Sequence, residues 1–170
     1  TEIWDKKVEF VLPASKNAGK HSYTPHQLHD ILTSRDGEFT LEHLQTIFSL
    51  FEDLINESSL ILCSEEVDAS KWLGIAKFFE ENSNLISEIQ LKELKLAKET
   101  RNCYMHNNGK IDQRWIDAYT EAKGNPIASI GDQLERGFPD VFHQIEEWHE
   151  LVVSLTGKIK TKIENKEISV

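Results

Sequence analysis

Apolar residues recur every three or four positions along most of this chain, which is the pattern of amphipathic helices packed around a core. The clearest case follows Thr40, a polar N-cap, after which leucine, isoleucine and phenylalanine keep helical spacing as far as Asn56. Similar spacing and caps predict further helices over residues 25–35, 72–81, 85–106, 114–122 and 139–163. We therefore expect an all-α, bundle-like fold.

The first 38 residues differ from the rest of the chain. Residues 6–12 alternate between polar and apolar, which indicates a short edge strand or an irregular arm. Pro25, at a first helical position, and Gly37 then bound the short helix. We divide the chain into an N-terminal extension, residues 1–38, and a helical domain, residues 39–170.

The composition limits the classes of protein to consider. Acidic residues outnumber basic ones by 29 to 19, and a net charge of −10 excludes a protein that coats nucleic acid with a uniformly basic surface. No apolar run approaches the roughly 18 residues that cross a bilayer, and no signal-peptide pattern is present, so we expect a cytoplasmic protein without a membrane partner. The two cysteines, Cys63 and Cys103, are predicted to be reduced.

The predicted helix over residues 85–106 carries two apolar faces. On a helical wheel the first face, which we expect to meet the monomer core, gathers Leu85, Ile86, Ile89, Leu96, Ala97, Cys103 and Tyr104. Leu91, Leu94 and Met105 lie nearly opposite and form a second apolar strip. Such a strip needs a cover, supplied either by a neighbouring helix of the same chain or by a second copy of the protein.

The end of this helix also gathers positive charge. Residues 92–114 include six basic and three acidic residues, although the chain as a whole is acidic. This stretch is either a solvated helix face with ion pairs or a confined groove that attracts phosphate. Arg101 and His106 flank the second strip at the same place, which favours the groove. The helix ends at Asn107-Asn108-Gly109, residues that suit a left-handed C-terminal cap.

An arginine five residues before a histidine is weak evidence alone, but its context adds to it. From Arg101 to Asp112 the chain reads R-N-x-x-x-H-N-x-G-x-x-D, which resembles the HEPN family of prokaryotic toxins, abortive-infection proteins and RNA-processing nucleases. The order of helices from about Trp72 through Trp115 is also similar to a HEPN core, with residues 41–56 and 139–163 as flanking helices. The resemblance implies a HEPN-like helical bundle with an N-terminal extension.

This resemblance implies a metal-independent endoribonuclease that works as a homodimer, in which Arg101 and His106 of both subunits meet in one cleft. Arg101 would hold two phosphate oxygens as a planar fork, and His106 would exchange a proton near neutral pH. Asn102 would orient the histidine ring or a phosphate oxygen. Attack by the RNA 2′-hydroxyl would leave a 2′,3′-cyclic phosphate and a 5′-hydroxyl, and no metal or other cofactor is expected.

Further residues complete the predicted site. We expect four polar residues to contact RNA, namely Lys98, Asn107, Lys110 and Arg114. The residues of the second strip, Leu91, Leu94 and Met105, would bury the dimer contact. A toxin or antiviral defence effector of this kind would also have an antitoxin or sensor protein as a partner. Some HEPN toxins carry a tyrosine two residues after the histidine that a nucleotidyltransferase modifies, and this chain has Asn108 there.

Two other functions fit the same sequence. One is a catalytically inactive HEPN-like module that dimerises or binds RNA or nucleotides within a larger protein. The other is a helical adaptor in which the R-N-x-x-x-H sequence is only a capped helix end.

Other candidate groups have simpler interpretations. Glu146 and His149 form Glu-x-x-His, which binds a di-metal centre only with a second copy and two more glutamates, so we expect a polar helix face. Cys103 is better explained as a buried thiol than as a nucleophile. Trp115 is expected to pack in the core, with stacking on an RNA base as the alternative.

Overall fold

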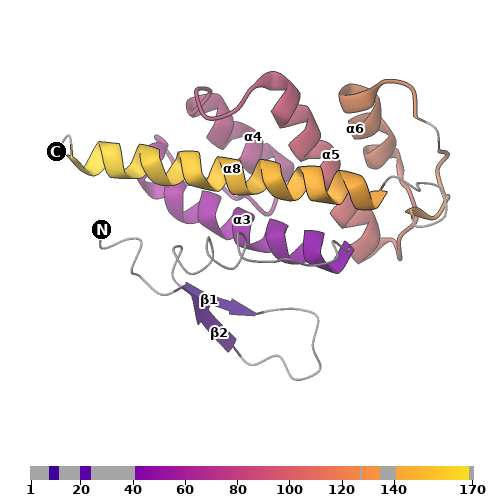
Figure 1. The fold of residues 1–170 in the computed structure, drawn as a ribbon, viewed down its shortest axis with the longest axis horizontal. Coiled ribbons are helices and arrows are strands. Elements are labelled where there is room, and N and C mark those ends of the chain that lie inside the picture. The colour runs from indigo at the N-terminus through magenta and orange to yellow at the C-terminus, as the bar shows by residue number, and fades with distance from the viewer. Residues whose placement is uncertain (1–7, 12–19, 24–40, 127, 135–140, 169–170) are drawn as a thin grey trace.

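The computed structural model describes residues 8–11, 20–23, 41–126, 128–134 and 141–168 (Figure 1). Its helices are α3 (Leu41–Leu62), α4 (Trp72–Glu81), α5 (Glu88–His106), α6 (Gln113–Lys123) and α8 (Val141–Ile168). Within these residues the fold is all-α, as predicted, apart from one small hairpin. The helix predicted over residues 25–35 lies outside the described residues.

The hairpin joins β1 (Val8–Val11) to β2 (Lys20–Tyr23). The two strands pair antiparallel, with Val8 opposite Tyr23 and Val11 opposite Lys20. The alternating pattern over residues 6–12 therefore does mark a strand. Its partner, β2, is polar throughout most of its length and gives no comparable pattern in the sequence.

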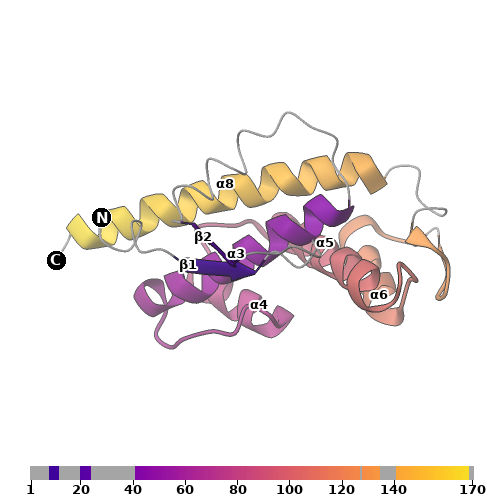
Figure 2. The same ribbon diagram turned by 90° about the horizontal axis from the view of Figure 1, so that it is seen from below.

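Helix α5 is the central helix of the bundle. It contacts α3, α4, α6 and α8, and α3 and α8 also pack along each other. In Figure 2, α8 forms one layer, and α4 and α6 lie on the opposite side of α3 and α5. Because α5 has neighbours on several sides, consecutive residues in its second half are buried: Leu96, Ala97, Lys98, Glu99 and Thr100.

Helix limits follow local capping. Helix α5 begins at Glu88, later than predicted, because Ser87 is its N-cap: the Ser87 hydroxyl accepts a hydrogen bond from the Gln90 amide, and the Gln90 side chain accepts one from the Ser87 amide. Helix α3 does not end near Asn56, as predicted, but continues to Leu62. The side-chain oxygen of Asn56 accepts a hydrogen bond from the Ala69 amide instead of capping the helix.

The two predicted faces of α5 are only partly correct. Leu96, Ala97 and Cys103 are buried, as expected, but Ile89 is 73% exposed because the burial of α5 begins only at Leu94. Leu94, assigned to a dimer contact, is itself fully buried in the monomer core, which corrects that assignment. The same chain therefore covers the middle of the second strip.

The ends of the second strip remain nearer the surface. Leu91 is half-buried against the core, and Met105 is 36% exposed. Among the described residues, none of the helices combines the length and the apolar character required to span a bilayer.

Candidate functional site

Arg101, Asn102 and His106 occupy the C-terminal end of α5, but their side chains have different surroundings. His106 is the last residue of the helix, and its side chain is exposed. Only 16% of the Arg101 side chain is exposed, and Asn102 is half-buried. In the same helix, therefore, the motif combines an accessible imidazole with a guanidinium that is largely buried.

The guanidinium of Arg101 is directed toward α3. Its Nη2 lies 3.8 Å from a carboxylate oxygen of Glu52 and donates to the hydroxyl of Ser49 at 3.5 Å. Its Nη1 donates to the side-chain oxygen of Asn102 at 3.3 Å. Its Nε is buried without a hydrogen-bond partner among the described residues. All these contacts are long for a charged donor, so the hydrogen-bonding capacity of Arg101 is incompletely used.

Asn102 fixes one side of this guanidinium. Its side-chain nitrogen donates to the carboxylate of Glu99 at 3.3 Å, while its oxygen accepts the bond from Arg101. Glu99 is itself buried. Asn102 thus links Arg101 to Glu99 and fixes the orientation of the arginine side chain. From the sequence we had expected Asn102 to orient the histidine ring or a phosphate oxygen.

Lys98 is not on the surface, which corrects the expectation that it contacts RNA. Only 2% of its side chain is exposed, and its ammonium forms an ion pair with Glu52. The same ammonium donates to the backbone carbonyl of Ser70 at 2.9 Å. The reason is that this position of α5 faces α3 and the segment before α4, where a buried ammonium needs a carboxylate and further acceptors.

Sequence reasoning missed Ser49 and Glu52. The available signal was a single carboxylate on the apolar side of α3, among Phe48, Phe51 and Ile55. A carboxylate in such a position is retained only when a cation meets it inside the protein. The identity of that cation could not be read from the sequence.

The turn after His106 is held together by backbone hydrogen bonds. Asn108 and Gly109 both have positive φ angles, of 53° and 74°, and the Gly109 amide donates to the Cys103 carbonyl at 3.0 Å, which confirms the predicted left-handed cap. Backbone hydrogen bonds of 2.9 Å then tie residues 109–111 to residues 131–134. Lys110 is exposed on this turn.

Asp112 organises the other polar residues of the turn. It caps α6 by accepting a hydrogen bond from the Trp115 amide, and it also accepts bonds from Asn107 and Arg114, each at 3.0 Å. Burial alone would raise the pKa of Asp112, but these hydrogen bonds hold it below its usual value. Asn107 and Arg114 are thereby held next to the end of α5, and Arg114 keeps 66% of its side chain exposed.

Cys103 and Trp115 both belong to the core. Cys103 is 1% exposed, and burial raises the pKa of its thiol to about 11, which agrees with a packed thiol and not with a nucleophile. Trp115 is also 1% exposed: its indole nitrogen donates to Thr100 at 2.9 Å, and its ring stacks on Tyr119. The alternative in which Trp115 stacks on an RNA base is therefore wrong.

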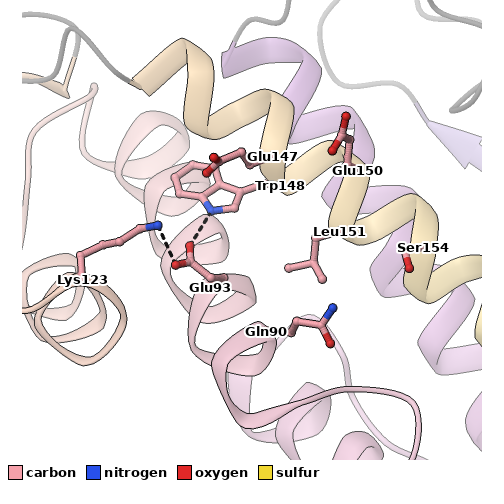
Figure 3. A pocket seen from close by; sticks show the side chains of 8 residues that line it. All are labelled: Gln90, Glu93, Lys123, Glu147, Trp148, Glu150, Leu151 and Ser154. Atoms are coloured by element: carbon pink, nitrogen blue, oxygen red, sulfur yellow. Dashed lines mark hydrogen bonds and ion pairs between the residues drawn. The ribbon is translucent and has the colours of Figure 1, made fainter.

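A separate pocket of about 390 Å³ lies between α5, the end of α6 and α8 (Figure 3). Within it the Glu93 carboxylate accepts hydrogen bonds from Lys123 at 2.7 Å and from the indole of Trp148 at 3.3 Å. The lining is Gln90, Glu93, Lys123, Glu147, Trp148, Glu150, Leu151 and Ser154, which includes none of the motif residues.

No cluster of three or more histidine, cysteine or carboxylate side chains within the described ranges is arranged to hold a metal ion. Comparisons of the chain with family models, with curated proteins and with solved structures give no significant match.

Proposed function

We propose that this chain is a metal-independent endoribonuclease that acts as a homodimer, with Arg101 and His106 of both subunits around one scissile phosphate. The observation that carries the proposal is the state of Arg101, a fixed cation that is largely buried and yet has unused donors. An oxyanion is the partner that a guanidinium in this state lacks. The resemblance of R-N-x-x-x-H to the HEPN motif supports the same conclusion.

The chemistry assigns a role to each motif residue. The 2′-hydroxyl of RNA is the nucleophile, so the protein has to accept its proton, stabilise the charge on the phosphorane and assist the leaving 5′-oxygen. Arg101 stabilises the phosphorane, and the accessible His106 transfers a proton. Asn102, fixed by Glu99, keeps the guanidinium in place.

The surroundings of the motif supply the remaining contacts. Asn107, Lys110 and Arg114 lie on or beside the turn that follows His106, and they would bind the RNA backbone. The positive charges of Lys110 and Arg114 are confined to this part of the chain, which fits a protein whose net charge is −10. Met105 and the exposed part of Leu91 would form the contact between subunits. Leu94 would not take part in it, because it is buried in the monomer.

This activity is that of a toxin or an antiviral defence effector domain in the cytoplasm. An enzyme that cuts RNA there without a cofactor would be restrained by a second protein, an antitoxin or a sensor.

The test is RNA cleavage by the purified protein in excess EDTA. We expect the wild type to cut and both Arg101→Ala and His106→Ala to lose at least about 100-fold in rate, as is typical for a lost transition-state donor or general acid–base group. Lys92→Ala is the matched control, because Lys92 is a cation in the first part of α5 that pairs with Glu88 at 2.7 Å. Its rate should stay within about twofold of the wild-type rate.

The assay also separates the alternatives. If the wild type binds RNA without cutting it, and Arg101→Ala releases the RNA, the chain is a binding module and the nuclease proposal is wrong. If the wild type is a monomer that neither binds nor cuts RNA, the motif is only a helix end.

A further inference from the structure

We propose that Lys98 keeps the guanidinium of Arg101 available for an oxyanion by occupying the buried carboxylate of Glu52. The inference rests on the proposed function, in which Arg101 binds the scissile phosphate. It gives Lys98 and Glu52 positioning roles, since neither residue would touch the substrate.

The geometry is that of one carboxylate shared unequally by two cations. One oxygen of Glu52 pairs with the ammonium of Lys98, and the other lies 3.8 Å from the guanidinium of Arg101. The exposed fractions are 2% for Lys98, 10% for Glu52 and 16% for Arg101. The lysine therefore holds the inner and closer position, and the arginine holds the outer and looser one.

The ammonium of Lys98 is fixed independently of Arg101. It donates to the Ser70 carbonyl at 2.9 Å and approaches the Ala69 carbonyl at 3.5 Å. These carbonyls belong to the segment that leads into α4. Lys98 is therefore anchored to that segment as well as to Glu52 of α3. If Arg101 moved outward to meet a phosphate, the charge of Glu52 would remain balanced.

Without Lys98, the same carboxylate would compete with the substrate. A guanidinium and a carboxylate prefer a two-point contact, and in the interior that pair is stronger than in water. Arg101 would then close onto Glu52 and use the donors that the proposed function needs. The other nearby carboxylate, Glu99, is held by Asn102.

Stability alone gives no strong reason for this arrangement. A buried ion pair can often be replaced by apolar or neutral groups of similar size with little loss of stability, whereas removal of one partner leaves an uncompensated charge. A lysine at 2% exposure is therefore better explained by what it does to Glu52 and Arg101 than by a contribution to folding.

The test follows the Arg101 side chain directly by NMR. The Nε–H signal of Arg101 in ¹⁵N-labelled protein is recorded during a titration with inorganic phosphate, for the wild type, Lys98→Met and the double variant Lys98→Met/Glu52→Gln. We expect Lys98→Met to weaken the phosphate response by at least about tenfold, because the unpaired Glu52 captures Arg101. The double variant should return to within about threefold of the wild type, because the competing charge is gone.

Contrary outcomes are equally specific. A wild-type Arg101 signal that ignores phosphate, an unchanged response in Lys98→Met, or a double variant that stays as weak as the single one would each overturn the inference. If Lys98→Met does not fold, Glu52→Gln alone decides the question. It should bind phosphate at least as tightly as the wild type, and binding weaker by more than about threefold would contradict the inference.

The result can be separated from the fate of the nuclease proposal. If Arg101 responds to phosphate in this way but the protein cuts no RNA in EDTA, only the proposed nuclease fails. If RNA is cut while Lys98→Met leaves both the phosphate response and the cleavage rate unchanged, only the role of Lys98 fails.

Discussion

The indole nitrogen of Trp148 on α8 donates a hydrogen bond to the carboxylate of Glu93 on α5, at 3.3 Å. Lys123 of α6 binds the same carboxylate at 2.7 Å, so α6 and α8 are both fastened to α5 at this point. The next residue, Leu94, is fully buried. Helices of the same chain thus cover the centre of a strip that the sequence alone could have left for a second copy of the protein.

Leu94→Ala should therefore destabilise the monomer. We expect the free energy of unfolding in urea to fall by about 2–5 kcal/mol, the usual range when a buried leucine is truncated in a core. Leu73→Ala is the matched control, since Leu73 is 78% exposed, and it should change the free energy by less than about 0.5 kcal/mol. A loss below about 1 kcal/mol for Leu94→Ala would mean that Leu94 is not a core residue.

Met105→Glu should weaken the proposed homodimer and leave the monomer fold intact. Met105 is 36% exposed, so a charge there would keep contact with water in the monomer and lose it when a second copy covers the residue. We expect the dissociation constant of the dimer, from analytical ultracentrifugation, to rise by at least about tenfold. Ile89→Glu, at the other end of α5, is the control that should not move it. A wild type that is monomeric at every concentration contradicts the proposed assembly.

Asp53 should make stability depend on pH in a defined direction. Burial, and then the negative charges of Glu52 and Glu57, raise the pKa of Asp53 from 3.8 to about 6. The pKa of Asp53 is higher in the folded state than in the unfolded state, so folding favours the protonated carboxyl. The free energy of unfolding therefore falls as the pH rises from about 4 to about 6.

Asp53→Asn removes this dependence. We expect the variant to match the wild type near pH 4 and to exceed it at pH 7 by about 1 kcal/mol, a figure reduced for solvent screening because the side chain is only half-buried. Urea unfolding at both pH values measures the difference. A difference that is the same at the two pH values would show that Asp53 does not titrate as described.

Cys103 should be chemically inert in the folded protein. It is 1% exposed, and its thiol has a pKa raised to about 11, so it forms little thiolate at pH 8. Iodoacetamide at pH 8 should label Cys103 at least about tenfold more slowly in the native protein than in urea, as measured by peptide mass spectrometry. Equal labelling rates in both states would reopen the assignment of Cys103 as a reactive group.

The sequence predicted those features that depend on local pattern. Helix α4 has the limits expected from its apolar spacing, and Asn108 and Gly109 take the left-handed conformation that their side chains suit. Such features require only neighbouring residues. The same holds for the burial of Cys103, which follows from its position on the helix relative to Leu96.

Features that depend on distant partners could not be predicted in this way. Lys98 reads as a solvated cation until Glu52, 46 positions earlier, is found beside it. Leu94 appears uncovered in the sequence, and only the fold shows that it is fully buried in the core of the same chain. In both cases the sequence identified a residue that needs a partner, and only the fold could say which partner it has.

The most direct test of the proposed nuclease is the chemistry of the product ends after cleavage in excess EDTA. The account predicts that the wild type leaves a 2′,3′-cyclic phosphate and a 5′-hydroxyl, and that Arg101→Ala leaves the RNA intact while keeping the same fold by circular dichroism. RNA that stays intact with the wild type, or cleavage that requires added metal and leaves a 5′-phosphate, would contradict it.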